Sequence, residues 1–292
     1  MANIRDIRRR IRSARSIQQI TRAMKFVSAA RLRKAQDRVI AARPYARPML
    51  AVLNSLAARV PEQAHPLLAV RGNENIELVV ISADRGLCGA YNTNIARQAV
   101  EFLNAHSGSN VELNILGKRA RDFFRRRPYR VRHEATNVLQ SPGFADAAAI
   151  AKDLIDEFIS GRKDQIWLVY NEFKSVVQQR IVLEPLLPIK RLEHAEAAGS
   201  NEYLAGSSEY LYDERPEKVF ANLLPRHVEA QVFRALLEAS AAEHGARMAA
   251  MEAATNNASE MIEGLTLYAN KVRQAGITRE LIEVVSGAVS TE

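Results

Sequence analysis

The sequence predicts two long terminal helices that pair as an antiparallel coiled coil, with an α/β domain inserted between them. Apolar residues recur every three or four positions over residues 3–58 and again from Glu217 to about Gly287, which is the period of a helix. Between these stretches, strand-like runs alternate with amphipathic helices. Aromatic residues are only 6% of the chain, as is usual for long helices. The expected divisions are a helix in 1–60, the α/β domain in 70–215 and a helix in 216–288.

The N-terminal helix begins with a three–four pattern of apolar positions: Ile4, Ile7, Ile11 and Ala14. A second set continues the pattern after a shift of phase: Ile17, Ile20, Met24 and Val27. Such a shift changes the winding of a coiled coil locally. Proline removes a helical hydrogen bond, so Pro44 and Pro48 are expected to weaken or kink the helix.

The central region predicts a Rossmann-like α/β domain. Strands are expected at 76–83, 111–117 and 164–173, and the last is expected to form a hairpin with a strand in 176–189. Helices are expected at 93–106 and 143–161, the second ending at Gly161. Strands that alternate with helices favour a mainly parallel sheet covered by helices.

The C-terminal helix carries an apolar seam that is thin for its length. Its inward positions alternate steps of three and four, and most are small or polar: Met248, Met251, Thr255, Ala258, Ile262, Leu265, Ala269 and Val272. Pro225 is expected to interrupt the helix near its start. One pair of helices with such a seam buries little surface, so the rest of the pair faces water or a partner.

The positive charge is concentrated at the N-terminus. The whole chain carries +8, but residues 1–50 carry twelve arginines and two lysines against two aspartates. This local excess indicates an acidic partner: nucleic acid, a membrane surface or an acidic protein face. An Arg-rich start is also typical of a transit peptide, but the helical pattern continues past Ala30 with no processing boundary. No apolar run approaches the roughly 20 residues that span a bilayer.

The sequence offers no catalytic constellation. The turn "SADRGLCGAYN" matches neither nucleotide-binding glycine pattern, which favours a structural turn over a phosphate site. Cys88, the only cysteine, cannot form an internal disulfide and has no base nearby in sequence, so a small, semi-buried thiol is expected. No group of His, Cys, Asp or Glu has metal-ligand spacing. We therefore expect no catalytic, cofactor or metal site.

Three segments resemble the gamma subunit of the F-type ATP synthase, and the similarity runs along the whole chain. They are "ITRAMKFVSAARLRKAQ" (20–36), "DRGLCGAYN" (84–92) and "RMAAMEAATNNASEMIEGLTLYANKVRQAGITRELIEVVSGA" (247–288). The resemblance implies a noncatalytic rotor shaft. Its helix pair would turn inside a ring of three alpha and three beta subunits, which hold the nucleotide chemistry.

The resemblance also implies partners and contact residues. The α/β domain would be a foot that sits with epsilon on the membrane c-ring, at the cytoplasmic face of a bacterial membrane. Arg273 and Gln274 would contact a loop of beta, with Thr278 and Glu280 nearby. Met24 and Lys25 would lie opposite them and face an acidic lever region of beta, which Arg85 would also reach. The segment "EYLYDERP" (209–216) suggests three contacts to the c-ring: Tyr210, Tyr212 and Asp213.

Two other protein classes remain open from the residue patterns alone. A basic coiled-coil protein could bind nucleic acid, and a steep dependence of DNA binding on salt would support that function. An α/β enzyme could use the glycine turn, although nothing beside the turn supplies catalytic groups. The low content of large apolar residues in the terminal helices suits the rotor that the resemblance implies. The outer surface of such a shaft must slide inside its ring of subunits, so it is expected to project few large apolar residues.

Overall fold

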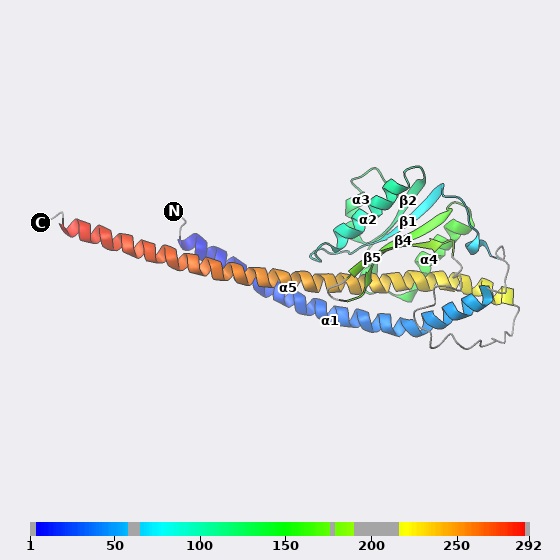
Figure 1. The fold of residues 1–292 in the computed structure, drawn as a ribbon, viewed down its shortest axis with the longest axis horizontal. Coiled ribbons are helices and arrows are strands. Elements are labelled where there is room, and N and C mark those ends of the chain that lie inside the picture. The colour runs from blue at the N-terminus through cyan, green and yellow to red at the C-terminus, as the bar shows by residue number, and fades with distance from the viewer. Residues whose placement is uncertain (1–3, 58–64, 176–178, 190–215, 290–292) are drawn as a thin grey trace. The chain divides into compact units, whose positions relative to one another are not determined.

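A computed structural model describes residues 4–57, 65–175, 179–189 and 216–289. The chain divides into two compact units, one made of Met1–Ala30 and Arg247–Glu292, the other of Arg31–Ala246. We call these the shaft unit and the α/β unit. Two long helices, α1 (Ile4–Ala57) and α5 (Pro216–Val289), each contribute residues to both units (Figure 1).

Both long helices run through their prolines. Pro44 and Pro48 lie within α1, and Pro225 lies within α5. The expectation that Pro225 interrupts the C-terminal helix is therefore wrong. The flanking residues Leu224 and Val228 are buried in the core of the α/β unit, and their packing holds the backbone helical despite the lost hydrogen bond.

The α/β unit contains a five-stranded sheet in the order β3-β2-β1-β4-β5. Its strands are β1 (Asn75–Ile81), β2 (Asn110–Leu116), β3 (Arg130–Ala135), β4 (Gln165–Phe173) and β5 (Gln179–Leu187). Neighbours pair in parallel, except for the antiparallel hairpin of β4 and β5. The predicted parallel sheet and hairpin are confirmed. The edge strand β3 was not predicted, because all but two of its residues are polar or charged and none is fully buried.

Helices cover both faces of this sheet and build two cores. On one face, Ile76, Leu78 and Val80 pack with α2 (Tyr91–Ala105) and α3 (Lys118–Phe124). On the other face, Val79 and Ile81 pack with α4 (Phe144–Ile159) and α5. Short 3₁₀ helices, η2 (Pro66–Leu68) and η3 (Val138–Gln140), complete the unit. The alternation of core sides along β1 is the period of two that a strand imposes.

The second core depends on α5. Five fully or almost fully buried side chains of this helix belong to it: Phe220, Leu224, Val228, Val232 and Leu236. The Tyr91 hydroxyl also donates to the Ala239 carbonyl at 3.1 Å, and the Gln179 amide donates to the Ala242 carbonyl at 3.1 Å. The first part of α5 is thus a structural part of the α/β unit, beyond the 70–215 boundaries that the sequence suggested.

Candidate functional site

The seam of α5 in the shaft unit lies where the sequence predicts it. Met251 and Ala258 are buried, and five further seam positions are half-buried: Thr255, Ile262, Leu265, Ala269 and Val272. Met248, one step earlier, is also half-buried. The predicted seam of α5 is confirmed, including its small and polar character.

The seam of α1 differs from the prediction, because the expected shift of phase does not occur. The inward positions continue the original three–four spacing through polar residues: Gln18, Thr21, Lys25 and Ser28. Ile17, Ile20 and Val27 are each more than half exposed. Apolar character alone pointed to the wrong face, since Gln18, Thr21 and Lys25 find partners on α5.

Three polar pairs join the helices across the seam. The Gln18 amide donates to the Ser259 hydroxyl at 2.7 Å, and the Thr21 and Thr255 hydroxyls lie 2.8 Å apart. Lys25 Nζ forms an ion pair with Glu252 Oε1 at 2.6 Å. Residue numbers rise along α1 as they fall along α5, so the predicted antiparallel pairing is confirmed. Such pairs fix the register of the two helices.

This register corrects one expectation about the partner contacts. Lys25 lies against Glu252, far before Arg273 along α5, so Met24 and Lys25 do not lie opposite Arg273 and Gln274. The polar pairs set the register, and the sequence reasoning did not recognise them. Met24 and Lys25 are half-buried, while the four C-terminal candidates are exposed: Arg273, Gln274, Thr278 and Glu280.

The candidate residues near the C-terminal end of α5 lie on a surface that is both polar and apolar. The Thr278 hydroxyl donates to the Gln274 carbonyl at 3.0 Å, a bond within α5 that satisfies its proton. Large apolar side chains are exposed along the same part of the helix: Leu267, Tyr268, Ile277, Leu281 and Ile282. The expectation that the shaft projects few large apolar residues is therefore wrong. Exposed apolar side chains gathered on one element, rather than scattered singly, indicate an interaction surface.

The glycine turn after β1 is built as a structural turn around Asp84. One carboxylate oxygen of Asp84 accepts from the backbone N–H groups of Lys118 and Asn137, each at 3.0 Å. Cys88 is buried more completely than the expected semi-buried thiol, and its sulfur accepts from the Asn92 amide at 3.1 Å. Arg85, the remaining beta-contact candidate, is exposed on this turn.

The left-handed backbone of this turn falls at Leu87 (φ 62°) and Gly89 (φ 58°). Gly86, in the same turn, does not have this backbone conformation, and a Cβ added there would meet the flexible end of Arg119, 2.8 Å away. Leu87 was missed by sequence reasoning. It is 64% exposed in a conformation that non-glycine residues seldom adopt, so the turn presents an apolar side chain to its surroundings.

Tyr210, Tyr212 and Asp213, the candidates for c-ring contact, lie outside the described residues. Within the described part of the chain, no cluster of three potential metal ligands occurs. Among the helices that the structure describes, none is both long and apolar enough to cross a membrane.

Comparison with known proteins identifies the family. Residues 3–290 match the family described as ATP synthase. The ATP synthase gamma chain of Solibacter usitatus (strain Ellin6076) is 47% identical, with all of both chains covered. The ATP synthase gamma chain of Anaeromyxobacter sp. (strain Fw109-5) is also 47% identical, with 99% of both chains covered.

Solved structures share the fold at lower identity. A chain in the Euglena gracilis mitochondrial ATP synthase (OSCP/F1/c-ring, rotational state 3) superimposes with a TM-score of 0.67 at 19% identity, covering 99% of this chain and 94% of that one. A chain of the rotor of that enzyme, in rotational state 1, gives 0.64 at 21% identity, covering 94% and 98%.

The chain folds as an antiparallel helix pair with an inserted α/β unit, and ATP synthase sequences match it along its length. These two findings define an ATP synthase subunit. Within this class, the chain belongs to the gamma chain family. Its family membership decides between the protein classes that the residue patterns left open.

Proposed function

We propose that this chain is the central-stalk rotor subunit of an F-type ATP synthase. It transmits rotation of the membrane c-ring to the catalytic beta subunits and so couples ion translocation to ATP synthesis or hydrolysis. The observation that carries the proposal is the shaft unit, whose helices are joined by polar pairs and a thin seam while their apolar and charged side chains face outward.

The chain itself is noncatalytic in this proposal. The beta subunits carry the catalytic sites, and three otherwise equal sites are driven into different states because the shaft contacts each of them differently. A ligand or partner shifts an equilibrium only by its differential interaction with the two states. Because the pair of helices is asymmetric, it contacts each beta subunit differently at each rotary angle. This role requires no cofactor on the chain itself.

The proposed partners are the alpha3-beta3 hexamer, the epsilon subunit and the c-ring, at the cytoplasmic face of a bacterial membrane. The basic excess of residues 1–50 suits an acidic face of beta. We assign the beta contacts to Met24, Lys25 and Arg85, and to a second set on α5: Arg273, Gln274, Thr278 and Glu280. Lys25 reaches beta only by sharing or breaking its ion pair with Glu252. The c-ring contacts are assigned to Tyr210, Tyr212 and Asp213.

Co-purification and rotation test this function. A tagged chain should purify with alpha and beta subunits as an active ATPase. With the beta subunits fixed to a surface, a probe at Ser107, an exposed position after α2 to which no partner contact is assigned, should rotate in one direction when ATP is added. A chain that assembles with the hexamer, yet stays still while ATP is hydrolysed, would rule out the rotor role.

A further inference from the structure

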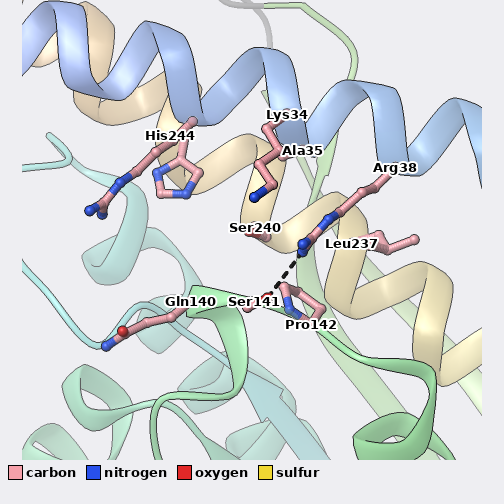
Figure 2. Close-up of a pocket in the computed structure, with 10 residues that line it drawn as sticks. Lys34, Ala35, Arg38, Gln140, Ser141, Pro142, Leu237, Ser240 and His244 are labelled. Carbon is pink, nitrogen blue, oxygen red and sulfur yellow. Dashed lines mark hydrogen bonds between the residues drawn. The ribbon is translucent and has the colours of Figure 1, made fainter.

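A basic pocket lies within the α/β unit, where α1 passes the segment after η3 and one stretch of α5 (Figure 2). Its cavity volume is about 240 Å³. The side chains that carry its chemistry come from three elements: Arg31, Lys34 and Arg38 from α1, Ser141 after η3, and Ser240 and His244 from α5. All lie in one compact unit, so the geometry of the pocket is defined within that unit.

The charge of the pocket is one-sided. Arg31, Lys34 and Arg38 are spaced by three and four residues, which places them on one face of α1. Among the residues that the structure describes, no aspartate or glutamate lines the pocket. Like charges at this spacing destabilise a helix, so an anion between them would relieve their repulsion.

The hydrogen-bond donors are partly preorganised. Arg38 Nη1 donates to the Ser141 hydroxyl at 3.3 Å, which holds the guanidinium over the pocket (Figure 2). Because Ser141 accepts this bond, its own proton is available to donate to a ligand. Ser240 donates to the Leu139 carbonyl at 3.0 Å, so it offers a ligand only lone pairs. The donors that face an anion are therefore Lys34, Arg38 and Ser141, with Arg31 as a further cation of the lining.

The size and the walls favour a small oxyanion. One water occupies about 30 Å³, so the cavity holds one tetrahedral oxyanion with several waters and is smaller than ordinary pockets for whole organic ligands. Its apolar walls come from Ala35, Pro142 and Leu237, all of which are buried. Apolar walls lower the local dielectric constant and strengthen charge pairing.

We propose that this pocket binds a tetrahedral phosphate-type anion, held by Lys34 and Arg38 with the Ser141 hydroxyl. The bidentate fork of Arg38 and the point charge of Lys34 suit a dianion with several oxygens. Free inorganic phosphate and the terminal phosphate of a nucleotide share this chemistry. The cavity volume favours inorganic phosphate, because a nucleoside would have to lie outside. The proposal is independent of the rotor function.

Titration calorimetry of the full-length chain with inorganic phosphate, at constant ionic strength held with chloride, tests the site. We expect saturable binding that sulfate displaces. A hydrogen bond to a charged group contributes about 1.5–3 kcal/mol, so Lys34→Gln and Arg38→Gln should each weaken binding by about tenfold or more. Lys34 is exposed, so its variant should fold normally even if Arg38→Gln does not.

The matched control is Arg33→Gln, which removes the same charge from an exposed position of α1 outside the pocket. It should change phosphate affinity less than twofold. Tighter binding of ADP than of phosphate, with the same loss in Lys34→Gln, would assign the site to a nucleotide phosphate. Absence of saturable phosphate and nucleotide binding, equal binding of acetate, or an equal effect of Arg33→Gln would overturn the proposal.

Discussion

Arg273 and Gln274 stand on an exposed part of α5, where their side chains add nothing to the seam of the helix pair. A side chain of this kind affects the isolated chain little, so any strong effect of its removal must come from a partner. The planar guanidinium of Arg273 suits a carboxylate on beta. The contribution of Arg273 and Gln274 to coupling must therefore be measured in the assembled complex.

Arg273→Ala and Gln274→Ala should leave the isolated chain folded and slow ATP hydrolysis or ATP-driven ion pumping in the complex. Loss of a charge-assisted hydrogen bond costs about 1.5–3 kcal/mol, which corresponds to about tenfold or more in rate if the bond forms at only some rotary angles. Arg273→Lys should be milder, because it keeps the charge but loses the fork. Wild-type hydrolysis and pumping in all three variants would make this face an ordinary solvated surface.

A buried charge cluster beneath α4 depends on one arginine. Arg132 Nη2 lies 2.7 Å from Glu77 Oε1, and Glu77 is fully buried. Arg132 also donates to Asp153 and thereby lowers the pKa of that carboxyl. Arg132→Ala would leave the Glu77 carboxylate unpaired, so unfolding in denaturant should show a loss of about 3–5 kcal/mol. Glu77→Gln in the same background should recover part of it, and no recovery would contradict this explanation.

His227 gives the α/β unit a dependence on pH. Burial, reinforced by the Arg234 cation, lowers the pKa of His227 to about 4 from 6.5. The unfolded chain therefore takes up a proton between pH 6.5 and 4 that the folded chain does not, and stability falls as the pH falls through this range. The loss is at most about 3 kcal/mol. His227→Gln should flatten the pH dependence of unfolding in this window, whereas identical slopes would refute the assignment.

At the scale of elements, the seam of α5 was predictable and that of α1 was not. On α5 the inward residues are apolar or small at each step, so their spacing reveals the face. On α1 the inward face changes from Ile11 and Ala14 to Gln18 and Thr21, whose value depends on partners in another helix. Strand β3 was missed for a similar reason, since it pairs with β2 at the edge and its two apolar residues, Val131 and Ala135, are only partly buried.

Paired substitutions on α1 distinguish the two faces. Ile7 is 3% exposed and Ile20 is 56% exposed. Ile7→Ser should destabilise the helix pair by about 2 kcal/mol or more through lost burial, while Ile20→Ser should stay within about 0.5 kcal/mol. Amide hydrogen exchange over residues 4–30 of the free chain measures both. Equal losses of protection in the Ile7→Ser and Ile20→Ser variants would show that Ile20 also lies in the seam, as the apolar spacing suggested.

At the scale of the whole chain, the strand–helix alternation was enough to predict the sheet, and three motifs together were enough to predict the family. The boundary between units could not be predicted, because Phe220 and Leu236 read as ordinary helix residues until the sheet that they cover is known. The partner contacts are still predictions, since each depends on a surface that this chain does not contain.

Excision of residues 70–215 should give a poorly folded fragment. Without α5, the face of the sheet formed by Val79, Ile81 and Leu168 loses one of the two helices that bury it, and only α4 remains there. Thermal melting followed by circular dichroism should show no cooperative transition for 70–215, whereas the full chain melts cooperatively. A sharp transition in the fragment would show that α2, α3 and α4 suffice, as the sequence first suggested.

The stretch of α5 from Ala239 to Gly245 is buried on every side, and a side chain added at Gly245 would come within 3.1 Å of the Phe173 ring. This crowding has an evolutionary consequence. Enlargement at Gly245, or at the fully buried Ala239, Ala241 and Ala242, displaces a neighbour, so substitutions should be purged at these positions whatever the protein does. Around Arg273 the helix surface is open and tolerates almost any side chain as far as folding is concerned. A residue conserved among related sequences would therefore have a different meaning in each stretch. Conservation in Ala239–Gly245 would reflect packing, and conservation around Arg273 would reflect selection by a partner.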